Sequence, residues 1–446
     1  MAEAAPSLEQ LAADMAAGKR SAEAALDACL ARIAAEDHQW KAILSLAPDA
    51  RDAARRADDS AGRGETFAPL HGIVLAIKDN IDLAGMATTS GCLALALATP
   101  RASAPVVERL QAAGAIIIGK TNLSEFSFEV RSRSSLGGDV ICPLAPGSTA
   151  GGSSGGSAVA VARGYAMAAI GTDTGGSIRI PAACNGLVGL RPAHGVLSLA
   201  GVAPLAPSTD TIGPITRSVA DAALLYRIMG GTIAQRGARP MRIGMLRQAF
   251  GADPAIIAAC EQAARRLKEA GVAVIDPVEI AELEALLDGP HIVDAEFAAA
   301  FDAYLARNFI AGTAPANLAA LLASGRFLPD HRDAITARLA YDRAATAVIL
   351  DQHRRLTIVL TEALARLRLD ALLYPTMRVI PRGLDNPKVG WAPELAARTG
   401  WPAMSIPVRG AARPIGVELL VPAGEEQLLF ALGRIVESAD ITASSA

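Results

Sequence analysis

Residues 151–157 read Gly-Gly-Ser-Ser-Gly-Gly-Ser, and residues 171–181 read Gly-Thr-Asp-Thr-Gly-Gly-Ser-Ile-Arg-Ile-Pro. The apolar segment 158–162 follows the first run, which favours a loop that leads into a helix over a flexible linker. In the second run, glycines let the backbone approach a ligand and turn successive N–H groups toward one point, as in an oxyanion hole. The pair of runs predicts a catalytic loop in which Ser177 is the natural nucleophile.

Strand and helix patterns surround these loops and predict an α/β architecture. Short branched apolar runs at 73–77 and 115–118 predict buried strands, with a helix over 106–113 between them. Ser7 and Ser21 are expected to cap the first helices. The other expected elements are helices within 7–58 and over 256–270, 281–287, 295–305 and 333–367, and strands at 371–374 and 415–420.

Composition excludes several classes of protein. The chain has 446 residues, of which 51% are apolar and 20% charged, so it has enough apolar residues to build a core and is not globally disordered. Its net charge of −3 lacks the basic excess of proteins that bind nucleic acid, and 4% aromatic content weakens any base-stacking role. We therefore expect no nucleic-acid partner.

Membrane insertion and secretion are not expected either. The longest uncharged stretch, 140–162, contains two prolines and the glycine-rich run, which a lipid-exposed helix does not tolerate. The first residues show no signal-peptide pattern, and the five cysteines are scattered without a Cys-x-x-Cys pair. These features predict a cytoplasmic protein with reduced thiols and no metal site.

The segment from Lys78 to Pro192 resembles the amidase signature family. Both glycine- and serine-rich runs match that family's hallmark nearly letter for letter, and Ser177 follows Ser153 at the family's spacing of 24 positions (177 − 153 = 24). The resemblance covers most of the chain and is weakest over roughly 235–370. Further matching landmarks are residues 78–80, 119–122, 125–126 and 402–407.

The resemblance implies a role for each matching position. Lys78 corresponds to the catalytic base, Ser153 to a bridging serine that follows a cis peptide at Gly152–Ser153, and Ser177 to the acyl-forming nucleophile. The oxyanion hole is expected from the N–H groups of Thr174, Gly175, Gly176 and Ser177. The expected supporting residues are Ser154, Asp173 and Arg179. The expected substrate pocket comprises Phe126, Ser127, Phe128, Gly152 and Trp391.

These roles make a proton relay without histidine. Lysine acts as a base only when it is neutral, and burial beside the apolar run 73–77 would lower its pKa by disfavouring the ammonium form. Lys78 would then take the proton of Ser153, which takes that of Ser177 as it attacks the carbonyl. None of the six histidines stands in a catalytic motif, and all six are expected to be structural or on the surface.

The resemblance also implies a fold with a large mixed, twisted central β-sheet flanked on both faces by α-helices. The whole chain, 1–446, is expected to form one amidase-signature domain. Its expected parts are N-terminal helices in 1–69, a signature core in 70–230, a variable helical part that shapes the substrate site in 235–370, and C-terminal strands and a helix in 371–446.

The predicted function is hydrolysis of C–N bonds in small-molecule amides through an acyl-enzyme, without a cofactor, by a monomer or homodimer. Trp391, Trp401 and the apolar helices of 281–350 favour neutral apolar or aryl amides and anilides, although esters and carbamates share the same route. Arg179 could clamp a substrate carboxylate, but it belongs to the motif whatever the substrate, so a structural role is expected.

Four alternatives compete with this interpretation. Residues 114–121 satisfy the P-loop pattern for nucleotide binding, although Ala-Ile-Ile-Ile in its centre is typical of a buried strand. Residues 151–155 satisfy the Gly-x-Ser-x-Gly nucleophile elbow, although two prolines precede them where a strand is needed. The glutaminase component of a tRNA-dependent amidotransferase is a third alternative, but Gly390 occupies the position where that group carries an acidic residue. The fourth is a catalytically silent binding module.

Overall fold

The computed structural model describes residues 6–65, 67–234, 240–342, 344–408, 413 and 415–438. The strands are β1 (Ile43–Leu46), β2 (Val74–Lys78), β3 (Ile116–Thr121), β4 (Arg133–Ser134), β5 (Gly138–Asp139), β6 (Ala168–Asp173), β7 (Val188–Arg191), β8 (Thr211–Thr216), β9 (Arg242–Met245), β10 (Ala273–Ile275), β11 (Ala371–Pro375), β12 (Ala403–Val408) and β13 (Ile415–Leu420).

The α-helices are α1 (Leu8–Ala16), α2 (Ala22–Trp40), α3 (Ala50–Gly62), α4 (Pro105–Ala112), α5 (Gly155–Ala162), α6 (Arg179–Cys184), α7 (Val219–Met229), α8 (Pro254–Glu269), α9 (Leu283–Leu287), α10 (Ile292–Asn308), α11 (Leu318–Ser324), α12 (Arg332–Leu339), α13 (Ala345–Leu367), α14 (Glu394–Thr399) and α15 (Glu426–Glu437). Short 3-10 helices lie at Leu93–Leu95, Glu125–Ser127, Arg247–Ala249 and Pro329–His331.

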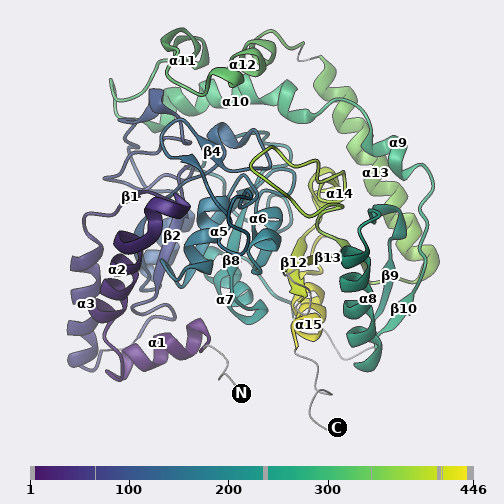
Figure 1. Ribbon diagram of the computed structural model, residues 1–446, viewed down its shortest axis with the longest axis horizontal. Coiled ribbons are helices and arrows are strands. Elements are labelled where there is room, and N and C mark those ends of the chain that lie inside the picture. Colours follow the sequence, from purple (N-terminus) through teal and green to yellow (C-terminus); the bar gives the residue numbers. More distant parts are fainter. Residues whose placement is uncertain are drawn as a thin grey trace.

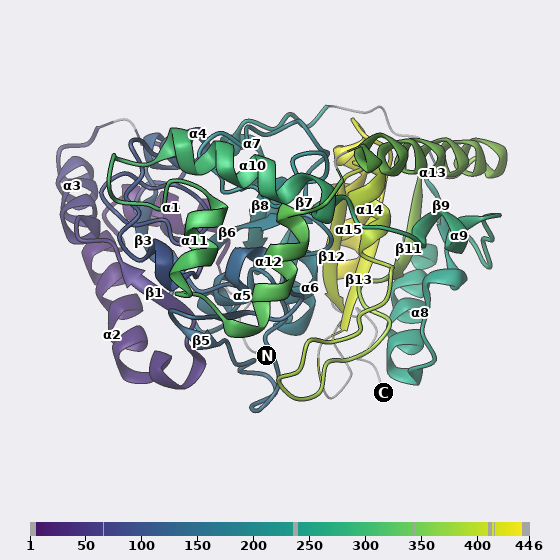
Figure 2. The same cartoon turned by 90° about the horizontal axis from the view of Figure 1, so that it is seen from above.

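Eleven strands form one mixed sheet in the order β1-β3-β2-β6-β8-β7-β12-β13-β11-β9-β10. β2 runs parallel to both β3 and β6, and β9 runs parallel to β10 and β11, whereas the central pairs are antiparallel. Helices flank both faces, and α10, α12 and α13 form an arc around one side of the strands (Figures 1 and 2). The predicted large mixed sheet flanked by helices is therefore confirmed.

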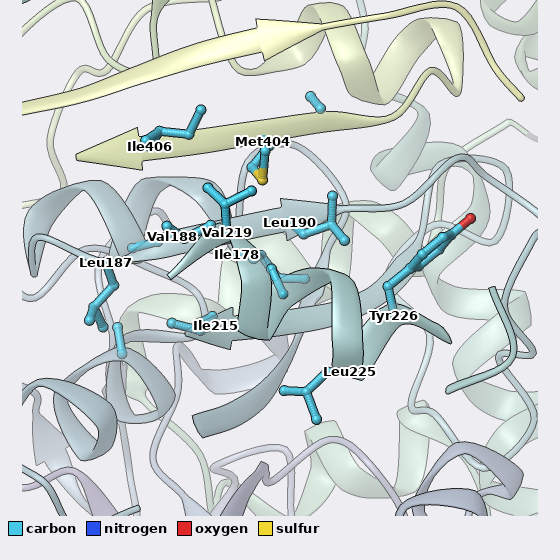
Figure 3. Close-up of a cluster of buried hydrophobic side chains, with 14 of the residues drawn as sticks. Ile178, Leu187, Val188, Leu190, Ile215, Val219, Leu225, Tyr226, Met404 and Ile406 are labelled. Atoms are coloured by element: carbon cyan, nitrogen blue, oxygen red, sulfur yellow. The ribbon is translucent and has the colours of Figure 1, made fainter. Parts of the chain in front are cut away.

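The parallel strands place the chemistry-bearing residues together. Lys78 ends β2 and Asp173 ends the neighbouring β6, so both stand at the carboxyl ends of adjacent parallel strands. The loop that follows β6 leads into α6 through Ile178, which packs into the buried cluster around Val188, Leu190 and Ile215 (Figure 3). The residue after Ser177 is thereby anchored in the core.

Most of the predicted elements are present near their expected positions. β2, β3, α4, β11 and β13 match the expected segments, and the side chains of Ser7 and Ser21 accept the cap hydrogen bonds of α1 and α2. No helix in the described part of the chain is both long and apolar enough to cross a membrane. The single-domain organisation and its internal divisions stay a prediction.

Three expectations about secondary structure are wrong. The N-terminal segment is not wholly helical, because α2 ends at the left-handed Lys41 and β1 then pairs with β3. The segment 235–370, expected to be helical, contains the short strands β9 and β10. No strand was expected at β6, β7, β8 or β12, which are buried along their whole length and therefore show no alternation of apolar and polar residues. The expected helix 333–367 is two helices, because α12 ends at Leu339 and α13 begins only at Ala345.

Candidate active site

The amine of Lys78 lies wholly inside the protein among hydroxyl groups. Its Nζ is 2.7 Å from Ser153 Oγ and 2.8 Å from Thr172 Oγ1. Ser127 Oγ is 3.3 Å away, and Asn80 donates from Nδ2 to the same Thr172 hydroxyl at 3.0 Å. Within the described part of the chain, no carboxylate forms an ion pair with this amine.

Burial favours the neutral form of Lys78. Desolvation lowers the pKa of Lys78 from 10.5 to about 7, although the carboxylates of Asp173 and Asp210 oppose the shift. A neutral amine has two N–H groups to donate and one lone pair with which to accept. Donation to Thr172 and Ser127 leaves the lone pair for the hydroxyl of Ser153, so the amine is placed to take that proton.

The same sheet contains a second buried lysine, which differs from Lys78 because it is paired with a carboxylate. Lys120 stands next to the end of β3, has no exposed surface, and pairs with the carboxylate of Asp79 at 2.9 Å. It also donates to Thr88 Oγ1 at 3.1 Å. Every residue of β3 is buried, so the segment that satisfies the P-loop pattern is a core strand and offers no phosphate cradle.

Ser153 stands in a tight turn just before α5. The Gly152–Ser153 peptide bond is cis, as the family resemblance implies. The Ser153 carbonyl accepts from Ser132 Oγ at 3.0 Å and from the Ser124 N–H at 3.1 Å, and Ser154 donates to the Thr172 carbonyl at 3.2 Å. No strand directly precedes this turn among the described residues, which disfavours a nucleophile elbow.

Ser177 faces a cavity rather than the core. It is 7% exposed and is the one of the three predicted catalytic side chains that lines the cavity described below. Its hydroxyl forms no hydrogen bond with any residue that the structure describes. Lys78 and Ser153 are therefore joined by a short contact, whereas no hydrogen bond joins Ser153 to Ser177 within these described positions.

The four expected oxyanion donors are not equivalent. The Gly176 N–H donates to Asp173 Oδ1 at 2.9 Å and is already used. Across the described chain, the N–H groups of Thr174, Gly175 and Ser177 donate to no protein acceptor. Three of the four backbone donors thus remain available for a developing oxyanion, and the fourth holds the loop in shape.

The carboxylate of Asp173 holds the loop together. It accepts from Arg179 at 3.0 and 3.1 Å, from Arg191 Nη1 at 3.0 Å and from the Ile178 N–H at 3.0 Å. Burial raises the pKa of Asp173, but the two guanidinium groups and the backbone donors outweigh burial and hold its pKa well below the ordinary value. A buried ionised group with this many partners fixes the loop that carries Gly176 and Ser177.

Every nitrogen of the Arg179 guanidinium is occupied within the core. Nε and Nη2 bind Asp173, Nη1 pairs with Glu418, and Nη2 also donates to the Pro393 carbonyl at 2.8 Å. The side chain has no exposed surface. Tyr374 donates to the same Glu418 carboxylate at 2.9 Å. Because each of its nitrogens is already paired and its side chain is buried, Arg179 serves the structure of the loop rather than a substrate carboxylate.

A second buried carboxylate, that of Asp210, also holds this loop. It accepts from Thr174 Oγ1 at 2.5 Å and from the N–H groups of Leu205 and Ala206 at 2.9 and 3.0 Å. Burial raises the pKa of Asp210, against these three hydrogen bonds. The Thr174 side chain is fixed by this contact, so its backbone N–H keeps one direction.

A cavity of about 170 Å³ opens on Ser177. Loop residues, the catalytic loop and three helical segments form its walls. Its lining residues are Ser127, Phe128, Glu129, Val130, Thr174, Gly175, Ser177, Leu205, Thr209, His291, Ile292, Val293, His353, Glu394, Ala397 and Arg398.

Comparison with known proteins shows the family. The amidase family model matches residues 24–430 of the chain. The chain belongs to the amidase family. The family resemblance seen in the sequence motifs is thereby confirmed.

The relatives of this chain include a peptide amidase and amidotransferase subunits. The native peptide amidase from Stenotrophomonas maltophilia is 33% identical, with a TM-score of 0.84 over 97% of this chain and 96% of that one. A glutamyl-tRNA(Gln) amidotransferase subunit from Chloroflexus aggregans is 40% identical over 282 residues, which span 59% of this chain and 58% of that relative's length. The solved glutamyl-tRNA(Gln) amidotransferase subunit from Thermotoga maritima is 26% identical, with a TM-score of 0.73 and coverage of 97% and 94%.

The expected pocket residues of the amidase divide into two sets. Ser127 and Phe128 line the cavity, and Ser127 also contacts Lys78. Phe126 instead packs in an aromatic cluster with Phe297 and Phe301, at ring separations of 6.2 and 5.6 Å. Neither Gly152 nor Trp391 is among the described lining residues.

The packing around Gly152 and Trp391 explains why neither lines the cavity. A Cβ at Gly152 would lie 2.5 Å from the backbone of Arg131, so the glycine is needed for close packing. The Trp391 ring stacks with Arg378, whose Cζ is 5.4 Å from the ring centroid.

Several functional positions of the amidase have no role in the sequence-based prediction. Thr172 and Asn80 stood inside the quoted motifs, but nothing in the sequence indicates that they surround the lysine. Arg191 and Asp210 are separated in sequence from the loop that they hold, so only the folded chain brings them to it. The ionisable cavity residues Glu129, His291, His353, Glu394 and Arg398 come from segments without a recognisable pattern.

The histidines of the amidase take different places. His353 is 7% exposed, and burial, aided by Arg398 and His291, lowers its pKa to about 4, so it is neutral at pH 7. His331 packs 5.4 Å from the Phe128 ring. Among the described residues, no group of three or more His, Cys, Asp or Glu side chains is arranged to hold a metal ion.

Proposed function

We propose that the amidase cleaves C–N bonds of small-molecule amides through an acyl-enzyme, with Ser177 as nucleophile, Ser153 as relay and Lys78 as base. The observation that carries the proposal is the fully buried amine of Lys78, which lies 2.7 Å from Ser153 Oγ and has a pKa lowered to about 7. A serine hydroxyl is a weak nucleophile and needs a base with a pKa near the working pH. Lys78 meets that condition without any histidine.

The proposed acylation step balances without another reactant. Ser177 Oγ forms a bond to the carbonyl carbon while its proton passes to Ser153, whose own proton passes to Lys78. Negative charge develops on the carbonyl oxygen, where the free N–H groups of Thr174, Gly175 and Ser177 are the available donors. The C–N bond then breaks, and the relay returns the proton to the leaving amine.

Deacylation repeats the sequence with water. Water gives a proton to the same relay, attacks the acyl carbon and releases the acid together with free Ser177. The Ser177 hydroxyl reaches Ser153 by a side-chain rotation in this proposal, since the two are not yet hydrogen-bonded. The contact between Lys78 and Ser153 is formed before substrate arrives.

The cavity supports neutral amides as substrates. Phe128, Leu205, Ile292 and Val293 give it apolar walls, and a carboxylate that enters such walls unpaired loses hydration at a high free-energy cost. Aryl and alkyl amides and anilides fit these walls, and esters and carbamates can follow the same acyl route. The likeness to a peptide amidase adds amide-terminated peptides to the substrates that we propose to test.

Covalent labelling tests the nucleophile. A fluorophosphonate should add to Ser177, and peptide mapping should find the adduct there in the wild type and nowhere in Ser177→Ala, which should also lose turnover while its circular dichroism is unchanged. An adduct on Ser153 or Ser154 would overturn the assignment. A folded wild type that takes no label and cleaves no amide, ester or carbamate would instead support a silent binding module.

A glutaminase role is the second candidate, favoured by the identity of 40% to the amidotransferase relative over 58% of that protein's length. The position of Gly390 argues against it. A Cβ there would lie 2.4 Å from Arg378 Cδ, so an acidic side chain does not fit without displacing the arginine. Release of ammonia from free glutamine at a rate above that from neutral aryl amides would favour the glutaminase.

A further inference from the structure

The wall of the cavity formed by α14 carries an arginine. Arg398 is 7% exposed and lines the cavity that opens on Ser177. It is the only arginine or lysine among the described lining residues. A cation so deeply buried needs hydrogen-bond acceptors, so its partners decide what it can do.

One nitrogen of this guanidinium has no partner. Nε donates to Glu394 Oε2 at 2.8 Å, and Nη2 lies 2.5 Å from the same oxygen. Nη1 is buried and, among the described residues, donates to no acceptor. A buried donor left unpaired raises the free energy of the protein, and an oxygen atom of a ligand in the cavity would remove that cost.

The charges around Arg398 decide whether a charged or a neutral ligand oxygen can accept a hydrogen bond from Nη1. Glu394 already neutralises the guanidinium, and His353 adds no charge at pH 7 because its pKa is lowered to about 4. Glu129, the other acidic lining residue, is balanced by Arg131 at 3.1 Å and by Arg133 at 3.4 Å. A carboxylate would therefore add an unbalanced negative charge beside Glu394, whereas a neutral carbonyl oxygen would not.

We propose that Arg398 is a specificity-determining residue that donates from Nη1 to a neutral carbonyl oxygen in the unreacted part of the substrate. Amides with a second carbonyl group near the scissile one, such as acylated amino-acid amides, are then the preferred substrate class. The proposal rests on the proposed amide hydrolysis at Ser177. It assigns to Arg398 the recognition that Arg179 cannot supply, because all nitrogens of Arg179 are occupied.

Three matched amides test the proposal. They are phenylpropanamide, its acetamido derivative and its carboxy derivative, with the added group on the carbon next to the scissile carbonyl. We expect wild-type kcat/KM to be highest for the acetamido compound and lowest for the carboxy compound. In Arg398→Met the preference for the acetamido compound over phenylpropanamide should fall roughly ten- to a hundredfold, the range for a hydrogen bond to a charged donor.

Two further variants keep the test decisive. Arg354→Met is the matched control, because Arg354 is exposed, pairs with Asp351 at 3.0 Å, and lines only the neighbouring cavity; it should keep the wild-type preference. Arg398→Lys retains a charged donor and should keep part of the preference if Arg398→Met fails to fold. Arg354→Met should also cleave phenylpropanamide at close to the wild-type rate.

The outcomes separate the two proposals. An unchanged preference in Arg398→Met, or a wild type that favours the carboxy compound or shows no preference, would overturn the role of Arg398 and leave amide hydrolysis standing. A folded wild type that cleaves none of the three amides and takes no fluorophosphonate label would overturn the proposed function itself.

Discussion

The strand-built core over 70–230 and the helices α9–α13 differ in how deeply their ion pairs are buried. In the core, Asp173 and its two arginines have no exposed surface and are joined by several hydrogen bonds. In the helical part, ion pairs such as Arg355 with Glu282 have both side chains more than half exposed. Exposed pairs contribute little to stability, whereas breaking a buried pair is costly.

From this difference we infer that the core carries out the reaction and that the helical part selects the substrate. Buried ion pairs of Asp173 hold the loop that carries Ser177, and buried hydroxyl groups surround the amine of Lys78, so the core tolerates few changes. The helical part reaches the same cavity through apolar and aromatic contacts, with Ile292 and Val293 on α10 and with the ring cluster around Phe297. Side chains held by packing alone can be exchanged without loss of the reaction. We therefore expect the largest mutational effects in the core and smaller, substrate-dependent effects in the helices.

Loss of the base should give the largest effect. Lys78→Met should lower kcat/KM by roughly 10²–10⁴-fold, the usual contribution of a general base. In the wild type, kcat/KM should rise as pH increases through about 7, because Lys78 accepts a proton only when neutral, and it should level off above that pH. Hydrolysis of a neutral anilide from pH 5 to 9 measures both.

Lys120 is the control for burial alone. Lys120→Met leaves Asp79 buried without its partner and should lower the free energy of unfolding by about 3–5 kcal/mol, as measured by urea denaturation. Lys78→Met should instead leave stability close to wild type or higher. Full activity in Lys78→Met, or a histidine variant as inactive as Ser177→Ala, would contradict the relay.

The sequence was most informative where local pattern and chemistry coincide. The run that ends at Lys78 predicts a strand because its apolar residues are continuous, and the same burial depresses the pKa of the lysine. The glycine-rich runs predict loops because they need unusual backbone geometry, such as the positive φ of Gly151 and Gly176. The mixed sheet follows from the family resemblance.

Long-range contacts explain what could not be predicted. Arg398 and His353 come from α14 and α13, and neither helix has a motif that indicates the cavity. α12 ends at Leu339 and α13 begins at Ala345, with no glycine or proline between them to indicate the break. Trp391 is a reasonable pocket residue on composition, yet its ring packs against Arg378. Cavity walls assembled from separate helices leave no periodic signal in the sequence.

A buried histidine should make stability in the helical part depend on pH. The folded pKa of His353 is about 4 and the unfolded value is near 6.5, so stability is fully present above 6.5 and is lost as pH falls toward 4. The loss by linkage, after allowance for solvent screening, is on the order of 2 kcal/mol. Denaturation between pH 7 and 4 should show a smaller loss for His353→Gln, while the exposed His38→Gln should follow the wild type. Identical curves for all three would contradict a buried neutral His353.

The smallest effect is expected where the two regions meet, at Phe128. The Arg338 guanidinium lies 4.1 Å from the centroid of that ring and is held by Asp294 at 3.0 Å. A cation over an aromatic face contributes about 0.5–2 kcal/mol. Arg338→Met should therefore raise KM for an aryl amide a few-fold, with kcat nearly unchanged, because Phe128 lines the cavity but does not touch the relay.

Arg332 of the same helix provides the control. It lies 5.3 Å from the centroid of Phe327, which is not among the described lining residues of the cavity. Arg332→Met should cost a similar amount of stability in thermal denaturation and leave KM as in the wild type. If Arg338→Met lowers kcat as strongly as Lys78→Met does, the contact with Phe128 is needed for the reaction step and not only for substrate binding. If both arginine variants raise KM equally, α12 acts on the cavity as a whole rather than through Phe128.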